Sequence, residues 1–178
     1  MTYVRPALLA LLILVGTLAT ISQATDLQHA KITMNRYLAA QTRWQDNLAA
    51  LLIKDKPEYT QIANAQRDHQ HALIALKRTR FYYLTTFAPQ RLNTAEMGRF
   101  TNFTWNKADT AAAIASYPGY SAREEEVART RAFNDQQPDW EAFRNYFQTS
   151  FSRSGAFKEE LARFQAELEE IKQEGKMK

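Results

Sequence analysis

The residues that come nearest to a chemical site form one short run of cations and rings. Lys77, Arg78 and Arg80 are followed by three aromatic residues, among them Tyr82. Ammonium and guanidinium groups bind anionic oxygens, and neighbouring rings can stack on the same ligand. The candidate anion-binding or partner-binding residues are therefore Lys77, Arg78, Arg80 and Tyr82. The alternative is that the cations complement a helix dipole while the rings enter the core.

A second candidate is an aromatic set in the C-terminal part of the chain. Trp140, Phe143, Phe147 and Phe151 recur at helical spacing. Rings on one face of a helix can line a groove for an apolar ligand or partner. The same spacing is also typical of side chains that fill a core. Both interpretations remain open at the level of the sequence.

Other kinds of chemistry leave no pattern in the chain. It has no cysteine, and His69 and His71 are two residues apart, which places them on opposite sides of a helix. It contains no Glu-x-x-His pair, no Gly-x-Ser-x-Gly elbow and no glycine-rich phosphate loop. We therefore predict no catalytic residue, no metal site, no cofactor and no enzymatic activity.

The first 24 residues have the pattern of an export leader. A short start with one cation, Arg5, precedes the apolar run 7–21, and Ser22-Gln23-Ala24 resembles a peptidase site. We expect cleavage after Ala24 and a periplasmic or secreted protein. The alternative is an uncleaved single-pass anchor in the inner membrane with a periplasmic domain, although the run is short for a bilayer span. Residues 25–178 are expected to form one domain.

Composition and proline positions predict an all-helical domain. Glycine and proline number five each in 178 residues, too few for a β-sandwich or barrel with frequent turns. The prolines after the leader lie where the helical spacing of apolar residues ends or resumes. Because proline inside a helix destabilises it, these prolines are predicted to mark helix ends. The expected helices cover 25–54, 57–88, 94–117, 121–134, 138–151 and 156–175, in an antiparallel bundle of five or six helices. Capping pairs are expected at Asn93 with Glu96 and at Ser121 with Glu124.

Amphipathic stripes define the expected packing. In the first helix one stripe is predicted at Leu27, Ala30, Met34, Tyr37, Gln41, Trp44, Leu48 and Leu51. In the third, Met97, Phe100 and Ile114 are among the residues expected to point inward. In the last, the stripe is Phe157, Leu161, Phe164, Leu168 and Ile171, with Glu160 outside it.

These features favour a binding protein of a bacterial cell envelope. We expect a protein partner, or self-association through coiled-coil-like amphipathic helices, in an accessory or adaptor of an envelope or secretion assembly or in a periplasmic chaperone. An anionic envelope polymer or a lipid headgroup is a further possible partner, and nucleic acid is not expected because the protein is exported. The alternative function is a small-ligand sensor or carrier with an aromatic-lined pocket.

Overall fold

The computed structural model describes residues 6–94 and 96–174, and it describes side chains from residue 26 onward. Within these residues the chain is all-helical, as predicted. Seven α-helices are present: α1 Pro6–Asp55, α2 Thr60–Phe87, α3 Met97–Phe100, α4 Lys107–Ser116, α5 Tyr120–Asp135, α6 Trp140–Thr149 and α7 Gly155–Glu174. Short 3-10 turns follow α1, α2 and α6: η1 Pro57–Tyr59, η2 Pro89–Arg91 and η3 Phe151–Arg153.

The predicted leader, residues 1–24, lies outside the residues whose side chains are described. The helix expected over 25–54 is the C-terminal part of the longer α1, and it ends at Asp55. Pro57 then opens η1, since a proline suits the first position of a helical turn. Over residues 26–94 and 96–174, whose side chains are described, no helical stretch is both long enough and apolar enough to cross a bilayer.

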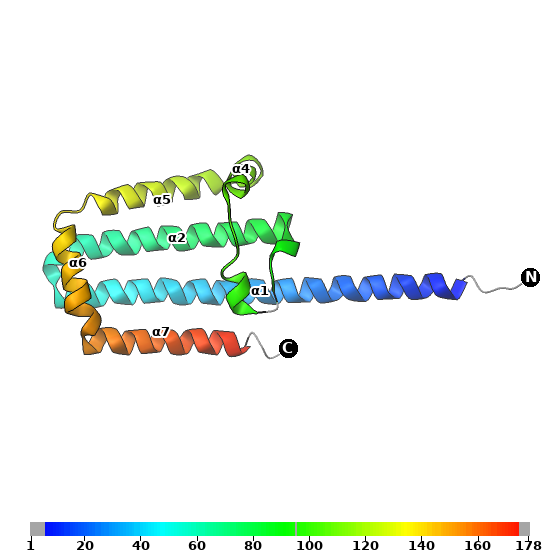
Figure 1. Ribbon diagram of the computed structural model, residues 1–178, viewed down its shortest axis with the longest axis horizontal. Coiled ribbons are helices and arrows are strands. Elements are labelled where there is room, and N and C mark those ends of the chain that lie inside the picture. The colour runs from blue at the N-terminus through cyan, green and yellow to red at the C-terminus, as the bar shows by residue number, and fades with distance from the viewer. Residues whose placement is uncertain (1–5, 95, 175–178) are drawn as a thin grey trace, which may run out of the picture.

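The four long helices form a single layer in the order α5, α2, α1 and α7 (Figure 1). Each runs antiparallel to its neighbours, and α6 crosses the end of the layer where α1 turns into α2 (Figure 1). α5 and α7 are the two edges. This arrangement makes α1 and α2 central helices, because each packs against a neighbour on either side.

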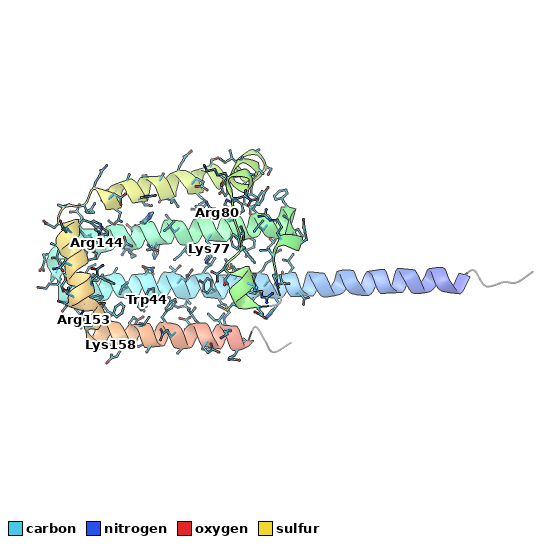
Figure 2. The ribbon with its side chains drawn as sticks, in the orientation of Figure 1. Trp44, Lys77, Arg80, Arg144, Arg153 and Lys158 are labelled. Carbon is cyan, nitrogen blue, oxygen red and sulfur yellow. The ribbon has the colours of Figure 1, made fainter. Side chains whose placement is uncertain are left out.

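Burial along α1 follows from this central position and corrects the single predicted stripe. Leu38 and Ala40 are both fully buried although residues two apart point about 200° away from each other on a helix. Leu38 belongs to the core shared with α2. Trp44 was predicted on the same stripe as Ala30 and Met34 of that core. It instead points toward α7 (Figure 2), where its ring stacks on Phe164 at 5.1 Å between centroids.

The structure has two separate hydrophobic cores. The large core joins α1 to α5 and comprises Ala30, Met34, Leu38, Ile74, Leu76, Phe81, Tyr83, Leu84, Leu92, Phe100, Ala113 and Tyr120. The hairpin core lies beside the α1–α2 link, with Leu52, Ile62, Ala63, Phe143 and Phe151 buried. Around the hairpin core stand half-buried hydrophobic residues: Leu48, Leu51, Ile53, Tyr59, Trp140, Tyr146, Phe147 and Phe157.

The third predicted helix is wrong as a continuous element, and its division raises the number of helices to seven. α3 is a single turn without a side-chain cap, and residues 101–106 are irregular. The run is rich in Thr and Asn, which compete for backbone hydrogen bonds. α4 restarts where Asn106 and Asp109 form a capping box, in place of the predicted Asn93 and Glu96. Because α4 starts again after the break, a different face of the helix is buried, and Ile114 is 54% exposed instead of pointing inward.

The predicted capping pair at Ser121 and Glu124 is also wrong. α5 begins one residue earlier, after Gly119, whose φ of 79° lies in the left-handed region that glycine adopts readily. Glu124 is then placed on the side of α5 that faces α2, where it accepts a hydrogen bond from Arg80 at 2.8 Å. The carboxylate therefore joins two helices instead of capping one.

α7 follows its predicted stripe with one exception. Ile171 is buried and Phe157, Leu161, Phe164 and Leu168 are half-buried. Glu160, expected outside the stripe, is buried and accepts a hydrogen bond from the Asn47 amide at 2.7 Å. A buried carboxylate is tolerated where it is hydrogen-bonded, and this one is also paired with Arg163 at 3.0 Å.

Candidate functional site

α6 is held across the end of the layer by rings and by one hydrogen bond. The ring of Tyr59 meets those of Phe143 and Tyr146 at centroid distances of 5.4 and 5.5 Å. The Tyr146 hydroxyl donates a hydrogen bond to the Asp55 carboxylate at the end of α1. Burial, and then this hydrogen bond, raise the pKa of Tyr146 above its ordinary value, so the hydroxyl keeps its proton. α6 is thereby fixed relative to both central helices.

An open groove of about 350 Å³ lies between α1, α2 and α6, and we call it the α6 groove. Its apolar lining residues are Leu48, Leu52, Trp140, Phe143 and Phe147. Its polar lining residues are Gln45, Gln66, Gln70, Arg144 and Gln148. The volume is within the range of small binding sites, in which apolar walls carry a few polar groups.

The structure brings together three of the four aromatic residues that the sequence singled out. Trp140, Phe143 and Phe147 line the groove because they are three, four and seven residues apart on α6. Phe151 does not line it: this residue lies in η3, is 2% exposed and packs beneath Phe147 at 5.6 Å between ring centroids. Three of the four predicted residues therefore line the groove, and the fourth, Phe151, belongs to the core beneath it.

The polar lining of the groove was not predicted. Gln45 comes from α1, Gln66 and Gln70 from α2, and Gln148 from α6. In the sequence only the spacing of Gln66 and Gln70, one helical turn apart, could have indicated a shared polar face. The exposed Arg144 adds a cation, with its guanidinium 6.0 Å from the Trp140 ring centroid.

The lining residues can bind apolar and amide groups, but they include no acid–base pair. Glutamine amides donate and accept hydrogen bonds, so they can pair with a peptide backbone laid over the apolar floor. The lining contains no carboxylate and no imidazole. The lining therefore offers apolar contact and amide hydrogen bonds to whatever lies in the groove.

The predicted cation cluster is divided among different partners. Arg80 donates to the Tyr120 hydroxyl at 3.2 Å and to Glu124 at 2.8 Å, and its guanidinium lies 5.2 Å from the Trp105 ring centroid. Burial opposes the charge of Arg80, but the hydrogen bonds to Glu124 and Tyr120 outweigh it and raise its pKa. Arg80 is therefore a matched cation between α2 and α5.

The other members of the cluster point elsewhere. Tyr82 accepts a hydrogen bond from the Asn35 amide at 2.8 Å, which ties it to α1, and Arg78 is exposed. The Lys77 ammonium lies 5.1 Å from the Tyr37 ring centroid, and burial lowers its pKa. Lys77 and Arg80 line one cavity, whereas Arg78 and Tyr82 are not among its lining residues. The run of cations in the sequence is therefore not one surface patch.

The two neighbouring histidines face different helices, as their spacing predicts. The His69 Nδ1 atom is 3.2 Å from the Thr130 hydroxyl of α5. The His71 Nε2 atom is 3.1 Å from an Asp46 carboxylate oxygen of α1. Burial lowers the pKa of His69. Within the described part of the chain, no group of three His, Asp or Glu side chains is placed to hold a metal ion.

Comparison with known proteins adds no assignment to this geometry. No protein-family model matches the chain, and neither a curated protein nor a solved structure matches it.

Proposed function

We propose that this chain is an exported adaptor that binds a segment of another polypeptide in the α6 groove. The observation that carries the proposal is the open groove whose floor is apolar and whose polar lining is mainly glutamine. Half-buried rings gain free energy when a partner covers them, at about 25 cal/mol for each Å² removed from water. The amides can pair with the backbone of the bound segment.

The shape of the cavity favours a polypeptide over a small molecule. A carrier buries most of its ligand in an enclosed space. The α6 groove is instead open to solvent, and its lining carries four glutamine amides that can pair with a polypeptide backbone. A chaperone that shields apolar segments would use the same surface. The exposed large hydrophobic residues elsewhere, such as Ile32, Ile114 and Phe133, lie on three different helices.

A small apolar ligand is the second candidate, because the groove volume of about 350 Å³ also suits a compact molecule. Such a ligand would lie against Trp140 and Phe147. Saturation with a small ligand would then block capture of a polypeptide at the same rings.

Photocrosslinking in the producing host tests the proposal. A photoreactive residue at Gln148, in the groove, is expected to capture a discrete polypeptide, and Phe147→Ala is expected to abolish that adduct. The same probe at exposed Arg131 on α5 is the control and is expected to capture nothing discrete. No polypeptide adduct from Gln148, or identical adducts from both positions, would contradict the proposal.

Export is a separate part of the proposal and rests on the leader pattern of residues 1–24. Sequencing the N-terminus of protein purified from the host tests it. A chain that begins at Thr25 is expected, and a full-length chain recovered from the cytosol would contradict export.

A further inference from the structure

A second cavity lies where the link between α3 and α4 crosses the layer. Residues 101–106 pass over one face of α2 on their way from α3, beside α1, to α4, near α5 (Figure 1). Between this link and α2 is a cavity of about 360 Å³, which is open to solvent like the α6 groove. Its lining residues are Leu73, Leu76, Lys77, Arg80, Thr101, Asn102, Phe103 and Trp105.

The two cations of this cavity differ in how their charges are matched. Arg80 reaches toward α5 and pairs with Glu124, whereas Lys77 reaches toward α1 and meets the ring of Tyr37 (Figure 2). Among the described residues, no carboxylate lies within ion-pair distance of the Lys77 ammonium. The ring face attracts a cation but supplies no oxygen to accept its hydrogen bonds. The cavity therefore holds one positive charge that the protein leaves unmatched.

Apolar side chains form part of the wall around Lys77, beside the polar side chains of Thr101 and Asn102. Leu73 and Leu76 form the α2 side, and Phe103 and Trp105 form the side of the link. Phe103 and Trp105 are held in place by the large core, since Trp105 packs edge-on against Tyr83 at 5.5 Å between ring centroids. The Trp105 indole N–H is already donated to the Thr110 hydroxyl at 2.9 Å. The ring also stacks on Tyr120 at 5.8 Å between centroids and lies under the Arg80 guanidinium, so only the remaining part of the ring can face a ligand.

We propose that this cavity binds a small organic monocarboxylate with an apolar chain or ring. The carboxylate would pair with Lys77, and the apolar body would lie against Leu73, Phe103 and Trp105. A dianionic phosphate group fits less well, because its second charge would need Arg80, which Glu124 already neutralises. This site is separate from the α6 groove and does not depend on the proposed function.

Titration calorimetry on the full chain with three eight-carbon probes tests the proposal. Octanoate is expected to bind, while uncharged octanamide is expected to bind about tenfold more weakly, because it lacks one charge-assisted hydrogen bond. Octyl phosphate is expected to bind no better than octanoate. Lys77→Met is expected to lower octanoate affinity about tenfold and to leave octanamide unchanged. Arg78→Met is the matched control, since this exposed neighbouring cation does not line the cavity and its loss should change nothing.

A second variant tests the position of the binding site without changing Lys77. Leu73 is 38% exposed on the cavity wall, so Leu73→Trp can fill the cavity without entering the core. It is expected to abolish binding of octanoate and octanamide while the unfolding midpoint stays unchanged. Equal binding of octanoate and octanamide, unchanged octanoate affinity in Lys77→Met, an equal loss in Arg78→Met, or no octanoate binding at millimolar concentration would each overturn the proposal.

Discussion

The two hydrophobic cores of this protein differ in how completely they exclude water. In the large core, Phe81, Leu84 and Tyr120 are fully buried, and residues from five helices close around them. In the hairpin core only five residues are buried, and half-buried rings such as Trp140, Tyr146 and Phe147 surround them. The large core has twelve buried hydrophobic residues and nine half-buried ones, whereas the hairpin core has five and eight. The hairpin end therefore leaves a larger share of its apolar side chains partly exposed, and these are the residues that the proposed partner would cover.

The largest expected effect is on the free energy of unfolding, and it should differ between the two cores. Phe81→Ala leaves a cavity in the closed core and should lower the free energy of unfolding by about 3–5 kcal/mol. Phe147→Ala removes a ring that is already half-exposed, so its cost should be about 1–2 kcal/mol. Urea unfolding followed by circular dichroism measures both. Similar losses for the two variants would remove the distinction between the cores.

A smaller effect is expected at the polar contact that orders the link beside the large core. Arg91 donates to both Asp109 carboxylate oxygens, at 2.5 and 2.9 Å, and Asp109 also completes the cap of α4. Asp109→Ala should therefore lower the free energy of unfolding by about 1–2 kcal/mol. The exposed pair of Asp135 with Arg131 is the control, and Asp135→Ala should cost little.

The Asp109 carboxylate also predicts that the stability of the protein falls at low pH. The hydrogen bond from Arg91 holds the pKa of Asp109 below its ordinary value. The folded state therefore keeps this carboxylate ionised more readily than the unfolded state does, and its contribution is complete above the ordinary pKa of an aspartate. That contribution is lost as the pH falls through the lowered pKa. Asp109→Ala should flatten the acid limb of the stability profile, and an unchanged limb would contradict the assignment.

The smallest effect is expected at the α7 edge. Arg43 pairs with Glu167, and Arg36 pairs with Glu170 at 4.0 Å, but these side chains are largely exposed. Arg43→Gln should cost about 0.5 kcal/mol or less, and the cost should shrink in high salt. Trp44, which stacks on Phe164 and meets Phe157 edge-on, is expected to contribute most of the stability of the α1–α7 contact. A large, salt-sensitive loss in Arg43→Gln would show that the ion pairs dominate.

The parts of the fold that the sequence predicts are those set by local rules. Pro57 and Pro89 fix the ends of α1 and α2, because proline cannot continue a helix, and the short link between α1 and α2 makes them antiparallel. The break at 101–106 is harder to predict, since Asp109 of the capping box also accepts hydrogen bonds from Arg91, which lies 18 positions earlier in the chain. Tertiary contact, which periodicity does not encode, decides that region.

The candidate site likewise contains residues that the sequence could predict and residues that it could not. The spacing of Trp140, Phe143 and Phe147 predicts one aromatic face of α6, and these three residues line the groove. The glutamines of α1 and α2 could not be added to it, because they are about 70 to 100 positions away along the chain. The run of Lys77, Arg78, Arg80 and Tyr82 is divided for the opposite reason, since residues close together along a helix point to different neighbours. Only Lys77 and Arg80 of the four line one cavity.

The most direct test of the account is a titration of the polypeptide captured from the groove against two matched variants. Phe147→Ala and Phe133→Ala each remove one ring, the first from the α6 groove and the second from an exposed position on α5. With both variants folded, we expect Phe147→Ala to weaken binding at least tenfold and Phe133→Ala to leave it unchanged. Equal affinities for the two variants would contradict the assignment of the α6 groove as the binding surface.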